Sequence, residues 1–262
     1  MQEIVLNRAE FLVLLDVAGV STVVGLPARE LIPASREGHL KAVRQGHATL
    51  EQRGLLQVGP NGILVLDPRL VAIAATIARP RFALISVRST PGLGRQLALH
   101  YIAGEQVVEQ TFPAEGQHRL ALLDDLATLY ERLDVFFPLE VDPAPEATYD
   151  LAEEQFLRGK DLAEQSGVDP AAAAFAAFGL SAADAESIAV ALAQPAFGGT
   201  IAMLKCRGDE IVDARNPALA NGKRGAWTFL QTTPGAPRFS VARADATRLR
   251  AKLAAWLTSM EG

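Results

Sequence analysis

Two stretches of this chain, far apart in the sequence, carry the same order of residue types. Residues 73–88 read IAATIARPRFALISVR, and residues 188–204 read IAVALAQPAFGGTIAML. In each stretch an Ala-rich apolar run ends at a proline, Pro80 or Pro195, and a phenylalanine two positions later opens a run that favours a strand. Proline ends helices because it has no N–H to donate and its ring collides with the preceding turn. A repeated helix–proline–strand joint predicts a mixed fold with an internal duplication.

The rest of the first half fits that expectation. Apolar residues at steps of three and four predict helices over residues 6–18, 39–53, 67–79 and 117–133. Residues 55–66 predict a hairpin, and the runs RFALISV, QLALHYI and QVVEQTF predict a three-stranded antiparallel meander.

The second half repeats this order in outline. Residues 136–149 open with three prolines in twelve residues and predict a linker. Helices are predicted over residues 151–165, 169–178, 181–195 and 244–257, with strands at GTIAMLKC, EIVDAR, AWTFLQT and RFSV and a polar loop at NPALANGKRG. We therefore predict an α+β fold with an N-terminal half at 1–135, a Pro-rich linker at 136–149 and a C-terminal half at 150–262. The two α-β-meander-α halves are expected to be related by a pseudo-twofold axis and to share one antiparallel sheet.

Composition narrows the classes of partner. The chain has 25 Lys and Arg residues and 30 Asp and Glu residues. The resulting net charge of -5 argues against binding to nucleic acid. Cys206 is the single cysteine, so neither an internal disulfide nor a cysteine zinc site is expected. The first residues carry acids where a signal peptide would be basic, and no uncharged apolar run reaches the length of a membrane span. We expect a cytoplasmic protein with no membrane contact.

A search for catalytic chemistry in the sequence finds little. STPGLGR, at residues 89–95, lacks the spacing of a phosphate-binding loop and does not lead into a helix. The four histidines include no pair four residues apart, which argues against a metal site. No serine lies in a Gly-x-Ser-x-Gly frame. We predict no catalytic residue, no metal and no cofactor, and a protein that is not an enzyme.

Two binding hypotheses stay open. The helix and hairpin over residues 39–66 are arranged as in a winged-helix DNA-binding regulator, although residues 29–53 hold only five basic residues against three acidic ones and no basic cluster. The Ala-rich segment AAAAFAAF carries Phe175 and Phe178, which either pack in the core between helices or protrude to bind an apolar partner helix. We take Phe175 and Phe178 as the candidate partner-binding residues.

The order of features also resembles a known family, the EspG-like chaperones of type VII (ESX) secretion. The resemblance rests on EFLVLLDVAGVSTVVGLP near the start, a helix that ends in RGLL, a hairpin arm ILVLDP, a helix that runs into proline in IARPRFALI, and a closing GAWTFLQTTPGAPRFSVARADATRLRAKLAAWL. It implies a cytosolic, non-enzymatic, pseudo-twofold α+β protein. Such a protein would bind an exported helical-hairpin protein, such as a PE–PPE pair, and shield its apolar tip.

Overall fold

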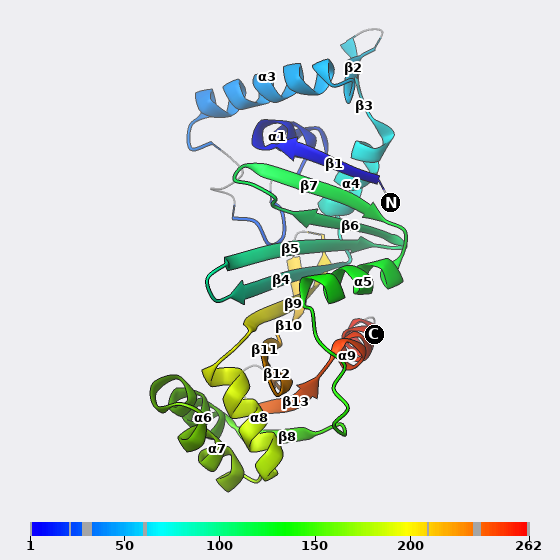
Figure 1. Ribbon diagram of the computed structural model, residues 1–262. Helices are drawn as coiled ribbons and strands as arrows, with labels where there is room; N and C mark the ends of the chain where they lie inside the picture. The colour runs from blue at the N-terminus through cyan, green and yellow to red at the C-terminus, as the bar shows by residue number, and fades with distance from the viewer. Residues whose placement is uncertain are drawn as a thin grey trace. The chain divides into compact units, whose positions relative to one another are not determined.

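A computed structural model describes residues 2–20, 22–27, 33–59, 62–208, 210–232 and 237–260 (Figure 1). The contacts within the chain define two compact units. Unit 1 comprises Met1–Ile85, Leu97–Leu129 and Leu204–Asp213, and unit 2 comprises Ser86–Gln96, Tyr130–Met203 and Ala214–Gly262. The segments of the two units alternate along the chain. The division of the sequence into two halves joined by a linker at residues 136–149 stays a prediction.

The fold is α+β, as predicted. In the described part of the chain, eleven strands belong to one antiparallel sheet and two form a separate hairpin. The elements of the first part of the chain are β1 (Gln2–Asn7), α1 (Arg8–Val17), α3 (Arg36–Gln52), β2 (Leu56–Val58), β3 (Leu64–Leu66), α4 (Pro68–Ala78), β4 (Phe82–Thr90), β5 (Gly94–Ala103), β6 (Gln106–Thr111), β7 (Gln117–Leu123) and α5 (Leu126–Phe136).

Helix starts in unit 1 are set by local side chains. The Asn7 side chain accepts hydrogen bonds from the backbone N–H groups of Ala9 and Glu10, and the Glu10 carboxylate accepts one from Asn7 N–H in return. Ser35 caps α3 through Gly38 N–H, and Asp67 caps α4 one residue before Pro68. Helices α1 and α4 then bury Phe11, Leu14, Leu70 and Ile73 against the strands in one apolar core.

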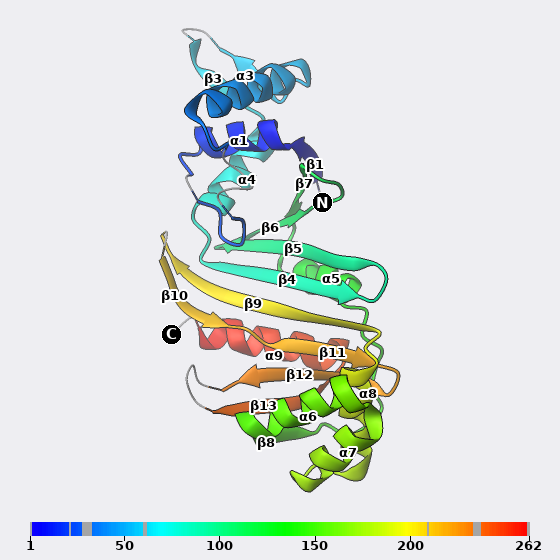
Figure 2. The ribbon, with the colours of Figure 1, turned by 90° about the vertical axis from the view of Figure 1, so that its left-hand side faces the viewer.

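Unit 2 places helices on both faces of its strands. The remaining elements are β8 (Thr148–Ala152), α6 (Glu153–Ser166), α7 (Val168–Ala177), α8 (Ala182–Ala193), β9 (Phe197–Arg207), β10 (Glu210–Arg215), β11 (Ala218–Gly222), β12 (Gly225–Gln231), β13 (Arg238–Ala244) and α9 (Ala246–Ser259). Figures 1 and 2 show α6, α7 and α8 on one side of β11, β12, β13 and β8 and α9 on the other.

Neighbouring residues of β12 show why both faces are covered. The Trp227 indole N–H donates to Ser187 Oγ of α8 at 3.0 Å, whereas Thr228 Oγ1 lies 3.3 Å from Lys252 Nζ of α9. Successive side chains of a strand point to opposite faces, so one strand serves two helical layers.

Several sequence predictions were wrong in detail. Residues 117–123 form strand β7 instead of helix, so four strands follow one another where three were predicted. Strands β1 and β8 were not predicted: residues 6–7 and 151–152 were expected to begin helices, and residues 148–149 were expected in the linker. Strand β11 lies inside the predicted polar loop. The remaining predicted helices and the hairpin are found within a few residues of their predicted bounds, and residues 60 and 61 at the hairpin turn lie outside the described residues.

The repeated joint has the same backbone form at both places. Arg79, which ends α4, has φ −141° and ψ 61°, and Gln194, which ends α8, has φ −136° and ψ 57°. Phe82 and Phe197 are both buried. The strand order β1-β7-β6-β5 has a counterpart in the order β8-β13-β12-β11. In each of these two orders, the strand that precedes the first helix pairs with the last strand of the meander, β1 with β7 and β8 with β13.

Candidate partner-binding surfaces

The hairpin of β2 and β3 in unit 1 exposes large apolar side chains. Val58, Ile63, Leu64 and Val65 are 40–63% exposed, whereas Leu56 and Leu66 at the base of the hairpin are buried in the core of unit 1. The register pairs Leu56 with Leu66 at the base and Val58 with Leu64 toward the turn. We call Val58, Ile63, Leu64 and Val65 the hairpin surface. Exposed apolar residues that gather in one place are typical of protein-binding surfaces.

An ion pair at the end of α3 fixes the base of this hairpin. Glu10 is almost fully buried and accepts from Arg53 Nη1 at 2.8 Å, while Arg53 Nη2 donates to the Val5 carbonyl at 3.0 Å. Arg53 stands immediately before Gly54, whose φ of 68° is the left-handed turn that ends α3. The hairpin therefore leaves α3 in a direction set by these contacts.

The same hairpin bears on the winged-helix hypothesis. A wing contacts DNA phosphates through Lys and Arg, and residues 54–66 contain neither. Arg53, the nearest basic residue, is already paired with Glu10. No observation in this part of the molecule favours DNA binding.

The two predicted partner-binding residues lie in different environments. Phe175 of α7 is 0% exposed and packs in the core of unit 2, so the expectation that it protrudes is wrong. The reason is Gly159 of α6: a Cβ there would lie 2.5 Å from Phe175 Cε1, so the ring occupies the space that the glycine leaves. Phe178, at the end of α7, is partly exposed and packs against the edge of the same core. Its role in partner binding stays a prediction.

A buried polar network ties several elements of unit 2 together. Arg243 of β13 donates to Asp184 Oδ1 of α8 at 2.6 Å and to Asp142 Oδ2 at 2.7 Å, and its guanidinium lies 5.1 Å from the Trp227 ring centre. Asp184 also accepts from the Tyr149 hydroxyl at 2.5 Å.

Asp184 is charged in this setting. Burial acts to raise its pKa, but hydrogen bonds from Tyr149, Ser181 and Arg243 together hold the pKa below its usual value. Each carboxylate oxygen of Asp184 has a donor, so the network holds structure and offers no free acid or base.

Two of the four histidines, His100 and His118, are also enclosed in unit 1. His100 and Glu109 lie opposite each other on β5 and β6, with Nε2 and Oε2 3.4 Å apart and both side chains buried. His118 stacks on Phe11 at 4.2 Å between ring centres, and burial lowers its pKa to about 4, with a further contribution from Arg8. Cys206 is buried as well, which raises its pKa. Over the described ranges no group of three or more His, Cys, Asp or Glu side chains is placed to hold a metal ion.

This chain resembles known proteins in structure and not in sequence. No protein-family model matches the chain, and no curated protein matches it in sequence. One solved structure that it resembles is that of the Mycobacterium tuberculosis type VII secretion system chaperone EspG5 in complex with a PE25–PPE41 dimer. The match has a TM-score of 0.69 at 16% sequence identity and covers 95% of this chain and 94% of the other. The chain has the fold of EspG5. At this identity the likeness establishes the fold alone.

The helices of this protein are short. None of those within the described ranges is both long and apolar enough to cross a bilayer.

The hairpin surface is a candidate that the sequence analysis did not identify. Its signal is a nearly unbroken apolar run on both arms, LLQV and ILVL, which usually indicates burial.

Proposed function

We propose that this protein is a non-enzymatic chaperone of the EspG kind, which binds an exported helical-hairpin protein and shields its apolar tip. The carrying observation is the fold match over 95% of the chain to EspG5, a chaperone whose structure was solved with a PE25–PPE41 dimer. A secretion chaperone must meet its substrate before export, so the proposal places the protein in the cytosol.

The internal duplication belongs to the same proposal. The corresponding strand orders of β1-β7-β6-β5 and β8-β13-β12-β11, and the matching backbone angles at Arg79 and Gln194, support two copies of one ancestral unit. Superposition of the two copies about Pro80 and Pro195 would be the direct check.

Two surfaces are candidates for the substrate contact. Phe178 at the end of α7 offers one partly exposed aromatic ring, and the hairpin surface offers four exposed aliphatic side chains. Either one would bury apolar area of a partner, which contributes about 25 cal/mol per Å² removed from water.

Co-expression tests the function. The full chain would be produced with tagged candidate substrates, namely the PE25–PPE41 dimer and the small helical-hairpin pairs encoded near its own gene. A chaperone should raise the soluble yield of one such pair and co-elute with it in size-exclusion chromatography. Failure with every pair would overturn the proposal.

Variants then locate the contact. Leu64→Lys and Val65→Lys charge the hairpin surface, and Phe178→Ala removes the exposed ring of α7. If either the hairpin variants or the Phe178 variant lose co-elution with the substrate while their unfolding midpoints stay unchanged, the surface that was altered is the substrate contact.

A further inference from the structure

The two end strands of the main sheet carry the same set of side-chain contacts. Strand β1 is the first in the strand order and belongs to unit 1, and β8 is the last and belongs to unit 2. The outer side of an end strand has backbone N–H and C=O groups that face no neighbouring strand, so it can pair with a strand of another molecule. What binds these groups therefore decides whether the sheet can be extended.

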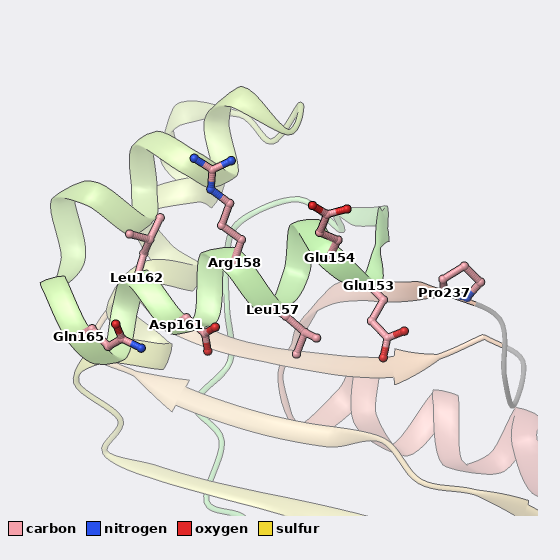
Figure 3. A pocket seen from close by; sticks show the side chains of 8 residues that line it. All are labelled: Glu153, Glu154, Leu157, Arg158, Asp161, Leu162, Gln165 and Pro237. Atoms are coloured by element: carbon pink, nitrogen blue, oxygen red, sulfur yellow. The ribbon is translucent and has the colours of Figure 1, made fainter.

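The outer side of β8 follows from its pairing with β13. Arg243 N–H donates to the Ala147 carbonyl at 3.0 Å, and Glu153 N–H donates to the Pro237 carbonyl at 2.6 Å. Figure 3 shows the Glu153 and Pro237 side chains at the same end of α6. Alternate residues of an antiparallel strand direct their backbone groups to the same side. The even-numbered residues from 148 to 152 therefore direct theirs away from β13.

Two of these outward backbone groups of β8 are bonded to side chains. Ala152 N–H donates to Gln155 Oε1 at 3.0 Å, and Gln155 is the third residue of α6. The Asp150 carbonyl accepts from Arg238 Nη2 at 3.1 Å, while Arg238 Nε donates to the Asp150 carboxylate at 2.8 Å. A charged guanidinium thus occupies a carbonyl that an added strand would need.

Strand β1 has the same contacts at the same relative positions. Asn7 N–H donates to Glu10 Oε2 at 2.8 Å, and Glu10 is the third residue of α1. The carbonyl of Val5, two residues before Asn7, accepts from Arg53 Nη2 at 3.0 Å. The N–H contacts also cap the two helices, but a helix start has no need of the arginine contacts.

The two arginines come from different elements. Arg53 directly follows α3, whereas Arg238 is the first residue of β13. The register places Gln117 opposite Asn7, and it places Arg238 opposite Ala152. A duplication would therefore make Gln117, and not Arg53, the counterpart of Arg238. Copying one half does not account for the shared contact, whereas a physical requirement common to both end strands does.

We propose that Arg53 and Arg238, the edge arginines, keep β1 and β8 from pairing with a strand of a second copy of this chain. An added strand would have to displace the guanidinium from the Val5 or Asp150 carbonyl before its own N–H could bind there. Hydrogen bonds that involve a charged group are stronger than neutral ones, so this exchange is unfavourable. The proposal does not depend on the chaperone function, because neither edge includes the hairpin surface or Phe178.

Self-association of the full chain tests the proposal at β8. The double variant Arg238→Met, Gln155→Ala frees the Asp150 carbonyl and the Ala152 N–H. Sedimentation velocity with up to about 0.5 mM protein measures the dissociation constant of the dimer. The variant should associate at least roughly tenfold more strongly than the wild type, because no charged hydrogen bond has to be displaced.

The matched control makes the same two replacements away from the edge. Arg224 forms an exposed ion pair with Glu186, and Gln165 is exposed near the end of α6. The variant Arg224→Met, Gln165→Ala loses the same charge and gains the same apolar side chains. Its association should therefore stay within about twofold of the wild type.

A second double variant tests β1. Arg53→Met, Glu10→Gln frees the Val5 carbonyl and leaves no unpaired carboxylate at the buried Glu10 position. Arg224→Met, Glu186→Gln is its control, because it removes an exposed ion pair with the same change of charge.

Hydrogen exchange locates the contact. The N–H groups of Val5 and Asp150 point to the outer sides of their strands, so pairing at an edge should protect them as the protein concentration rises. Association through another surface, such as the hairpin surface, would leave their exchange unchanged.

Three results would overturn the proposal: association of the wild type through either edge, equal association of the β8 variant and its control, or association of that variant without protection of Asp150 N–H. Circular dichroism confirms that each variant is folded. Arg238 is exposed, so the β8 variant decides the proposal even if the β1 variant does not fold. The assay contains no export substrate, so its failure leaves the co-expression test of the chaperone function unaffected.

Discussion

Replacement of Gly46 by alanine sets two physical effects against each other. Gly46 is in the middle of α3, where alanine favours the helix by about 1 kcal/mol over glycine. Helix propensity alone therefore predicts a more stable protein. The structure predicts the opposite, because Gly46 is where α3 lies directly against the backbone of α1.

The magnitude follows from the distances. A Cβ at Gly46 would lie 2.6 Å from the Ala9 carbonyl carbon, 2.8 Å from Val13 Cγ2, and closer still to the Ala9 carbonyl oxygen. Carbon atoms pack at about 3.5–4.0 Å, so α3 would have to move away from α1 by about 1 Å. Backbone cannot rotate aside as a side chain can, so the cost is near the upper end of the 1–3 kcal/mol typical of overpacking, roughly 3 kcal/mol. After the gain in propensity, we expect a net loss of about 2 kcal/mol.

Thermal unfolding followed by circular dichroism would show this as a midpoint lowered by about 4–8 °C. Because a chain with two compact units need not unfold in one transition, hydrogen exchange of α1 and α3 should accompany the melt. Ala48→Gly, at an exposed position of α3, is the matched control and should cost about 1 kcal/mol. If Gly46→Ala raised the midpoint while Ala48→Gly lowered it, propensity would have won and the close helix contact would be refuted.

Two further predictions concern buried charge and pH. Arg243→Met leaves Asp142 and Asp184 without their shared cation and should lower the free energy of unfolding by about 3 kcal/mol. Arg238→Met breaks only the exposed pair with Asp150 and should lower it by less than about 1 kcal/mol. Equal urea midpoints for the two variants would contradict this prediction. The pKa of His118 is lowered to about 4, so below pH 6.5 the unfolded chain takes up a proton that the folded chain does not bind until about pH 4. Stability should therefore fall as pH is lowered through this window, and between pH 7 and pH 5 the wild type should lose about 2 kcal/mol more than His118→Leu. Parallel losses in the two proteins would show that His118 is not the group responsible.

Local signals in the sequence proved reliable. The proline joints at Pro80 and Pro195 act within one helical turn, as do the side-chain caps at Asp67 and Ser181, so the neighbouring residues contain the information. Ser35, which caps α3, was not predicted as a cap, although its signal is equally local. The same holds for the hairpin of β2 and β3, whose partner strand is a few residues away.

Strands whose partners are distant in sequence were missed. β1 pairs Gln2 with Leu122, and β8 pairs Ala152 with Arg238, so neither short segment shows its partner locally. Strand β7 was taken for a helix because Leu120 and Leu123 fit a helical spacing, while the pairing with β1 and β6 that fixes it as a strand is a tertiary fact.

The candidate surfaces show the same difference between local and tertiary information. Neighbouring residues were enough to predict an α+β protein with a repeated helix–proline–strand joint, because capping, proline stereochemistry and apolar spacing are local properties. The exposure of each side chain could be known only from the folded protein, since burial depends on what packs against that side chain. Gly159 leaves the space that the Phe175 ring fills in the core, and the hairpin carries Val58 and Leu64 away from the core.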